Sequence, residues 1–160
     1  MRLLLYHGSD CAFDEIDLKR SQPKRDFGVG FYTTTIATQA ENWARSKKNR
    51  NLAEHAVVQV YEAELCDELR IKAYEGMTEE WLETIRRNRL QDGVQHSYDV
   101  MIGPAANDNT MMTVSRYLQG IYTVDEAIER LRYSKANDQI SFHTERAVRC
   151  LRLVRRYYAD

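Results

Sequence analysis

The sequence predicts a single α+β domain over residues 1–160. A chain of this length is the usual size of one compact domain. Strand-like segments rich in β-branched and aromatic residues alternate with segments of helical period, and no repeat, linker or low-complexity tract divides them. The expected strands cover residues 2–6, 30–34, 55–65, 69–74, 98–104, 139–144 and 150–158, and the expected helices cover residues 39–48, 79–89, 109–120 and 123–133.

The first half of the chain predicts four of these strands and one helix. The N-terminal strand, RLLLY, is expected to end where His7-Gly8-Ser9 turns the chain. The segment GFYTT has the aromatic and β-branched content of a second short strand. A capping-box spacing between Thr38 and Glu41 then opens the first helix. The next two strands are separated only by the polar residues CDE, so we expect them to pair with each other.

The second half predicts three helices and three strands. Thr78 is placed to cap a helix in which the apolar residues form one stripe. YDVMIGP is typical of a buried strand stopped by Gly103-Pro104. The next helix ends at Gly120, and a capping box of Thr123 and Glu126 opens the last one. The strands QISFHT and CLRLVRRYY are expected on either side of a short turn.

Charge and cysteine content argue against several classes of protein. The 23 basic and 24 acidic side chains give a net charge of −1, with no overall bias toward nucleic acid or an anionic membrane. Cys11, Cys66 and Cys150 are far apart and lack CxxC spacing, so neither a disulfide framework nor a metal site is expected. The chain has no stretch long enough to span a membrane and only a three-residue leucine run near its start. We therefore expect a cytoplasmic protein without a membrane partner.

Each candidate functional residue also has an ordinary structural interpretation. His7 at a strand end is more often a structural residue than a catalytic one. The Gly28-x-Gly30 pair is too short for a dinucleotide-binding motif, and a plain turn explains it. Tyr32 suits a buried strand and Trp43 suits a helix core as well as they suit a pocket. The basic clusters RRNR and RLVRRYY could contact nucleic acid, although such residues are usually just solvated.

Taken together, these residues stand in a recognisable order. HGS follows the first strand, FGVGFY comes next, and Trp43 lies eleven residues after Tyr32. This order resembles the ADP-ribosyltransferase superfamily in its His-Tyr-Glu branch, which includes diphtheria toxin and the poly-ADP-ribose polymerases and has a second tyrosine in the place of Trp43. Over nearly the whole chain the pattern is more similar to the bacterial DUF3990 family, in which YHGS, DFGxGFYxT, YDxxIGPxANDNT and NDQISFHT recur.

The resemblance implies an ADP-ribosyltransferase-like split β-sandwich of two small antiparallel sheets with flanking helices, and NAD as co-substrate between the sheets. The backbone of Gly8, open to close approach, would bind the nicotinamide carboxamide, while His7 and Ser9 would bond the two riboses. Tyr32 and Trp43 would stack on the two faces of the nicotinamide ring. The glycines of FGVGFY would let the loop bend so that Tyr32 enters the pocket.

The third motif departs from the branch. A glutamate there normally holds the nicotinamide ribose and stabilises the positive charge that develops as nicotinamide leaves. Gln139 takes that position here, and we expect it to be catalytic together with His7 and Tyr32. Glu145 is either a solvated charge beyond the strand or a carboxylate that activates an acceptor. Asn107-Asp108-Asn109 are either helix-capping and turn residues or a wall of the pocket.

The expected function is that of an NAD-dependent mono-ADP-ribosyltransferase, which transfers ADP-ribose to a protein or nucleic-acid acceptor. The alternatives are an NAD glycohydrolase on the same site and a non-catalytic module that binds NAD or ADP-ribose. By resemblance to bacterial proteins of this size, a toxin with a cognate inhibitor protein as partner is expected.

Overall fold

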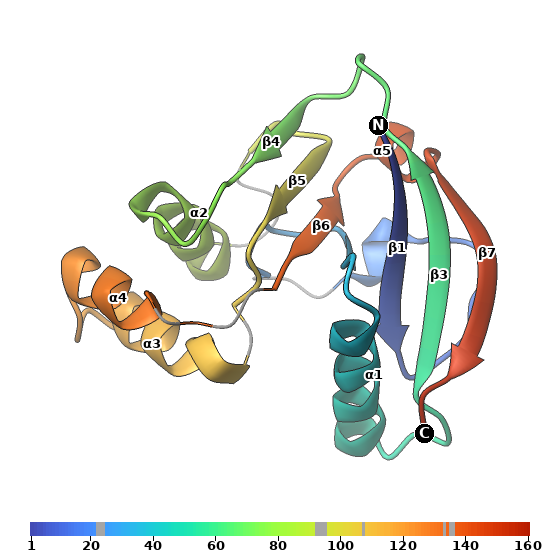
Figure 1. Ribbon diagram of the computed structural model, residues 1–160, viewed down its shortest axis with the longest axis horizontal. Helices are drawn as coiled ribbons and strands as arrows, with labels where there is room; N and C mark the ends of the chain where they lie inside the picture. Colours follow the sequence, from blue (N-terminus) through green and yellow to red (C-terminus); the bar gives the residue numbers. More distant parts are fainter. Residues whose placement is uncertain (22–24, 92–95, 107, 133, 135–136) are drawn as a thin grey trace.

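The computed structural model describes residues 1–21, 25–91, 96–106, 108–132, 134 and 137–160, and it has an α+β fold with two small sheets (Figure 1). The strands are β1 (Arg2–Ser9), β2 (Phe31–Thr33), β3 (Val57–Glu64), β4 (Ile71–Ala73), β5 (Val100–Gly103), β6 (Gln139–Phe142) and β7 (Leu151–Tyr158). The helices are α1 (Ala37–Asn51), α2 (Glu79–Leu90), α3 (Asp108–Leu118), α4 (Val124–Leu131) and α5 (Glu145–Val148), with a 3₁₀ turn, η1 (Leu18–Arg20).

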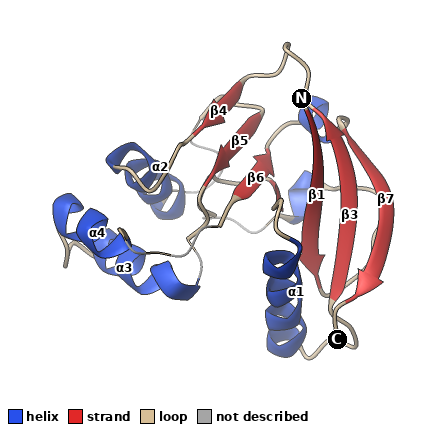
Figure 2. Ribbon diagram, viewed as in Figure 1, coloured by secondary structure: helices blue, strands red, loops and turns tan. Residues whose placement is uncertain are grey.

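The two sheets differ in size and pairing. The first has the order β1-β3-β7 and is antiparallel throughout. The second has the order β2-β6-β5-β4 and is antiparallel except for the parallel pair β4–β5. Figure 2 shows them as separate layers, with α1 beside β1 and with α2, α3 and α4 on the far side of the second sheet. A bridge between Tyr6 and Thr34 joins β1 to the chain just after β2.

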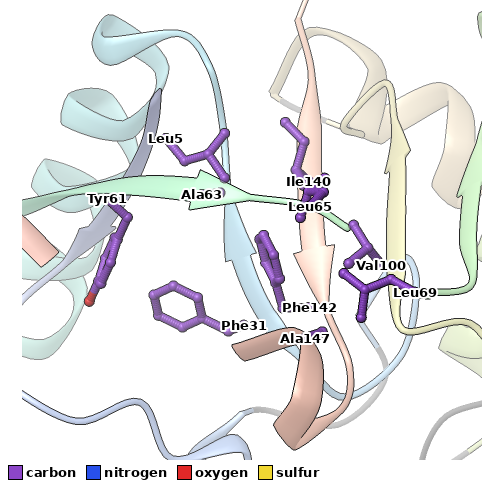
Figure 3. Close-up of a cluster of buried hydrophobic side chains, with 10 residues drawn as sticks. All are labelled: Leu5, Phe31, Tyr61, Ala63, Leu65, Leu69, Val100, Ile140, Phe142 and Ala147. Carbon is purple, nitrogen blue, oxygen red and sulfur yellow. The ribbon is translucent and has the colours of Figure 1, made fainter. Parts of the chain in front are cut away.

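Apolar side chains between the two sheets form the central core (Figure 3). Leu5 and Tyr61 come from the first sheet, and Phe31, Ile140 and Phe142 come from the second, and all five are buried. Burial of each such side chain contributes about 1.5–3 kcal/mol. The residues beside them in sequence point to the opposite faces of the sheets, as the period of two in a strand requires.

Helices cover those opposite faces. Ala40 and Ala44 of α1 pack against Val58 and Val60 of the first sheet, and small residues let the helix approach the strands closely. On the second sheet, α2 buries its apolar stripe, in which Trp81 is fully buried. The core therefore has three parts: one between the sheets, one under α1 and one under α2.

The predicted helix signals are confirmed for α2, α3 and α4. The Thr78 hydroxyl accepts a hydrogen bond from the backbone N–H of Trp81 at the start of α2. Thr123 and Glu126 form a complete capping box before α4. Gly120, just beyond α3, has a φ of 80°, a conformation that glycine adopts without strain.

Two predicted element boundaries were wrong. The first strand does not turn at His7-Gly8-Ser9 but continues to Ser9, because β3 is long enough to pair with it as far as Val57. The first helix begins at Ala37 after Ile36, and no side chain caps it, so Thr38 lies inside the helix. The backbone N–H of Ile36, the residue just before the helix, donates to the Thr34 hydroxyl.

The predicted pairing of the segments 55–65 and 69–74 was also wrong. Both edges of β3 are occupied, one by β1 and the other by β7, so β4 has no place beside it and pairs with β5. The turn expected between the last two strands contains the short helix α5, and these strands belong to different sheets. No helix in the described parts of the chain is long and apolar enough to cross a membrane.

Candidate functional site

A cavity of about 490 Å³ lies at the end of β1 and is the candidate site. Its volume is within the range of roughly 300–1,000 Å³ that is usual for small-molecule sites. His7 and Ser9 of β1 and Tyr32 of β2 line it, as do Arg25, in the segment before β2, and Lys47 of α1. The structure thus brings three of the residues predicted from the sequence onto one cavity, although they come from strands in different sheets.

His7 is held on several sides. Its Nδ1 lies 2.7 Å from the carbonyl oxygen of Tyr32, to which it donates when the proton is on that atom. The ring stacks on Phe31 with 4.2 Å between centroids and meets Phe13 edge-on at 5.6 Å. Burial lowers the pKa of His7 to about 4, so the ring is neutral near pH 7. With Nδ1 protonated, Nε2 is a hydrogen-bond acceptor.

Tyr32 closes the glycine loop that precedes it. Its hydroxyl donates to the carbonyl oxygen of Gly28 at 2.6 Å and accepts from the N–H of Phe27 at 2.9 Å. Gly28 has a φ of 86°, which residues with a side chain rarely adopt. Burial raises the pKa of Tyr32, so the phenol stays protonated. The loop therefore bends back on the tyrosine ring and directs it to the cavity.

Tyr32 and Trp43, here called the aromatic pair, both contact one guanidinium group. The Cζ atom of Arg25 lies 4.2 Å from the centre of the Tyr32 ring and 5.2 Å from the centre of the Trp43 ring. Trp43 is half-buried on α1 and is not part of the buried hydrophobic clusters described above. The two rings that the sequence predicted to act together are thus brought together, and a flat cation lies against both.

Gly8 presents its backbone to the free edge of the first sheet. Tyr6 exchanges both of its backbone hydrogen bonds with Thr34, at 2.8 and 2.9 Å, on the side away from β3. Successive residues of an antiparallel strand direct these groups to opposite sides, so Gly8 also directs its N–H and C=O away from β3. These two groups are oriented as bidentate recognition of a carboxamide requires.

The absence of a side chain at Gly8 has a different reason from the one expected. A Cβ atom there would lie 2.1 Å from the carbonyl oxygen of Ala40 and 3.0 Å from the nitrogen of Ala44. The glycine is thus required by the close approach of α1, whereas the sequence interpretation connected it with ligand access. The same contact fixes the position of α1 relative to β1.

Ser9 and the segment after it form another side of the cavity. Ser9 is buried, and its hydroxyl accepts the N–H of Cys11 at 3.4 Å. Gln59 holds the following segment, because its Oε1 accepts from the N–H of Phe13 at 3.0 Å and from Nε of Arg156 at 3.1 Å. Gln59 is itself fully buried, so this segment is fastened to the first sheet.

Gln139 lies in a buried network centred on the carboxylate of Asp26. Its Nε2 donates to Oδ2 of Asp26 and to the carbonyl oxygen of Pro104, both at 3.0 Å. Nε of Arg89 donates to Oδ1 of Asp26 at 2.7 Å, and the N–H of Ala106 donates to Oδ2 at 3.1 Å. The three residues that donate to Asp26 thus all lie far from it in sequence.

Gln139 and Tyr32 share one face of the second sheet, because Tyr32 pairs with Ser141, two residues further along β6. Gln139 is nevertheless not among the residues that line the cavity. Its contact with a nicotinamide ribose stays a prediction. Glu145 is exposed at the start of α5, beyond the strand.

Other candidates from the sequence have ordinary partners or lie outside the described part. Asn107 is not among the described residues; Asp108 and Asn109 begin α3. In the basic clusters, Arg89 pairs with Asp26, and Arg152 of β7 pairs with Glu62. In the part of the chain that the structure describes, no three metal-ligating side chains gather.

Sequence reasoning missed Arg25 and Lys47 as site residues. Lys47 follows Trp43 by four positions, so the helical period already places both on one side of α1. Burial lowers the pKa of Lys47, and Arg25 beside it acts in the same direction. No local spacing in the sequence marks Arg25 as a site residue, because its contacts with the Tyr32 and Trp43 rings depend on the tertiary fold.

Comparison with known proteins gives one family. A family model described as "Protein of unknown function (DUF3990)" matches residues 3–153. No curated protein and no solved structure matches the chain.

Proposed function

The chain belongs to the DUF3990 family, and for this member we propose the function of an NAD-dependent mono-ADP-ribosyltransferase. The observation that carries the proposal is the aromatic pair, which contacts a flat, delocalised cation beside a cavity lined by His7 and Ser9. The nicotinamide ring of NAD is also flat and positively charged. Aromatic faces attract such cations by about 0.5–2 kcal/mol per contact.

The groups around the aromatic pair fit the rest of the nicotinamide end of NAD. Gly8 directs one donor and one acceptor to the free edge of β1, which suits the carboxamide. Neutral His7 offers Nε2 as an acceptor, and Ser9 offers a hydroxyl, and both suit ribose hydroxyls. Lys47 adds a positive charge to the cavity, which suits a pyrophosphate.

The proposed reaction breaks the bond between nicotinamide and the ribose. Nicotinamide leaves with the electron pair of that bond and becomes neutral, while a nucleophile of a protein or nucleic acid bonds to the anomeric carbon and loses a proton. The aromatic pair would hold the leaving group, and His7 and Ser9 would orient the ribose. Gln139 is proposed to take part by positioning, because an amide supplies less charge stabilisation than the glutamate of related enzymes.

A non-catalytic module that binds NAD or ADP-ribose is the second candidate. The observation that favours it is the position of Gln139, whose amide group is hydrogen-bonded to Asp26 and Pro104. In this case the site would bind the ligand with the same residues but leave the nicotinamide–ribose bond intact.

The test is to incubate the protein with NAD labelled in its adenosine half, in a cell lysate, and to measure both labelled macromolecules and free nicotinamide. Transfer predicts both products in equal amounts, and a Trp43→Ala variant should form less of both in the same proportion. Free nicotinamide without a labelled macromolecule would identify a glycohydrolase, in which water is the acceptor. NAD binding by calorimetry without either product would identify the binding module, and no binding at all would refute the proposal.

A further inference from the structure

Arg25 lies where the proposed function places the nicotinamide ring, against both Tyr32 and Trp43. We infer that Arg25 is an intramolecular occupant of the aromatic pair and that NAD must displace its guanidinium group in order to bind. The contact is then autoinhibitory, because it lowers the affinity of the free protein for NAD. The identity of the competing ligand rests on the proposed function, while the occupation of the rings by Arg25 does not.

The chemical likeness of the two groups makes them competitors. A guanidinium group and a nicotinamide ring attached to ribose are both planar, and each carries one delocalised positive charge. Both are attracted to the negative faces of aromatic rings. They cannot occupy the same space, so each bound NAD molecule requires Arg25 to rotate away from the pair.

The surroundings of Arg25 show why it rests on the rings. Its neighbour in sequence, Asp26, has both carboxylate oxygens engaged, one by Arg89 and the other by Gln139 and a backbone N–H. Among the described residues, no carboxylate forms an ion pair with Arg25. Its contacts with the aromatic pair are therefore its main attractive interactions, together with the longer-range attraction of Asp26.

Positive charge near the aromatic pair weakens the hold of the pair on Arg25. Burial lowers the pKa of Arg25, and the positive charge of Arg89 acts in the same direction. Arg25 in turn lowers the pKa of Lys47, so these two cations also repel each other. Three carboxylates, those of Asp10, Glu15 and Asp17, line the same cavity as Arg25. The occupant is thus held by contacts that a ligand with its own hydrogen bonds can replace.

The first measurement tests occupation without NAD. Acrylamide quenches the fluorescence of accessible tryptophans, and of the two tryptophans Trp81 is fully buried whereas Trp43 is half-buried. Arg25→Ala and Arg25→Met should each raise the quenching constant by about two-fold or more, because the guanidinium no longer covers Trp43. Arg130→Ala is the matched control, since Arg130 contacts the ring of Tyr122 at 4.1 Å, far from the cavity in the fold. An unchanged quenching constant in both Arg25 variants would overturn the inference.

The second measurement tests competition by calorimetric titration with NAD. Both Arg25 variants should bind NAD several-fold more tightly than the wild type, and Arg130→Ala should bind like the wild type. Weaker or unchanged binding in the Arg25 variants would show that Arg25 is a ligand contact or a bystander, and would overturn the competition. If quenching rises but neither the wild type nor any variant binds NAD, the proposed function fails while the occupation by Arg25 stands. Arg25→Met keeps most of the stem, so the test survives if Arg25→Ala does not fold.

Discussion

At the scale of single residues, Asp26 explains why position 139 carries an amide. The Asp26 carboxylate is buried and already accepts hydrogen bonds from Arg89 and a backbone N–H. An amide nitrogen at position 139 adds a further donor to it at 3.0 Å. A glutamate would bring a second carboxylate into hydrogen-bonding distance, and like charges this close disfavour ionisation of both groups. The departure from the third motif is therefore coupled to the residue before FGVGFY.

Gln139→Glu should lower the free energy of unfolding by about 1–3 kcal/mol at pH 8. In the folded variant, proximity to Asp26 should raise the pKa of the new glutamate. When this glutamate is protonated, it can donate to Asp26 as the amide does. The loss of unfolding free energy relative to the wild type should therefore shrink as the pH falls through that pKa. Urea unfolding at pH 8 and pH 5 measures this difference against the wild type. Gln119→Glu, on an exposed position beyond α3, is the control. Equal stability of Gln139→Glu and wild type at both pH values would contradict the account.

Trp43 gives the second prediction at this scale. Because its ring is half-buried and lies outside the buried clusters, Trp43→Ala should weaken NAD binding by about 1–2 kcal/mol with little loss of thermal stability. Trp43→Phe keeps an aromatic face and should retain much of the affinity. Calorimetric titration measures the NAD affinity of both variants, and their melting temperatures measure thermal stability. A buried aromatic would instead cost about 3–5 kcal/mol of stability, with NAD affinity unchanged in the folded fraction.

At the scale of elements, α1 is the part that connects the first sheet with the candidate site. The face of the helix that packs Ala40 and Ala44 onto the sheet next to Gly8 also carries Trp43, whose ring contacts Arg25, and Lys47, which lines the cavity. A shift of the helix on the sheet would therefore move both site residues together. The packing of small residues against a glycine sets the geometry of the aromatic pair.

Gly8→Ala tests this connection. Its Cβ would lie 2.1 Å from a backbone oxygen of α1, so the helix must shift, and we expect a loss of about 3 kcal/mol in stability together with weaker NAD binding. Gly76→Ala is the matched control, because a Cβ there meets nothing within 4 Å and should change neither property. Chemical unfolding and calorimetry measure the two effects. Wild-type stability of Gly8→Ala would show that α1 is packed less closely than described.

At the scale of the whole molecule, two half-buried histidines hold the glycine loop and the strand that follows it. His7 on β1 contacts the carbonyl oxygen of Tyr32, and Nδ1 of His143, after β6, lies 2.8 Å from that of Val29. Nε2 of His143 lies 2.7 Å from the hydroxyl of Ser141. Burial lowers the pKa of each histidine to about 4. A neutral imidazole thus contacts the glycine loop at Val29, and another contacts the following strand at Tyr32.

This arrangement predicts loss of stability in mild acid. Because the folded-state pKa values lie near 4 and below the usual 6.5, the folded protein excludes protons that the unfolded chain binds. The stabilisation is complete above about pH 6.5 and is lost as the pH falls from there toward 4. Melting temperatures at pH 7, 5.5 and 4.5 should decrease steadily, and His143→Gln should show a smaller decrease over this range. A constant melting temperature from pH 7 to 4.5 would contradict the prediction.

The sequence by itself determined the α+β class, most of the secondary-structure segments and some of the residues that line the candidate cavity. The caps of α2 and α4 and the end of α3 were readable because each depends on residues within one turn of the helix. His7, Ser9 and Tyr32 were likewise recognised from short motifs, and they line the same cavity. Lys47 could have been added from its helical spacing to Trp43.

Only the tertiary structure decided which strands pair and which residues complete the site. β3 and β4 look like partners in sequence, but β1 and β7 occupy both edges of β3. Gln139 and Asp26 meet across 113 positions of the chain, and the contact of Arg25 with Trp43 depends on the position of α1, which packs closely on Gly8. Hydrogen bonds and aromatic contacts between distant residues depend on how the sheets and α1 pack, and local periodicity carries no information about that packing.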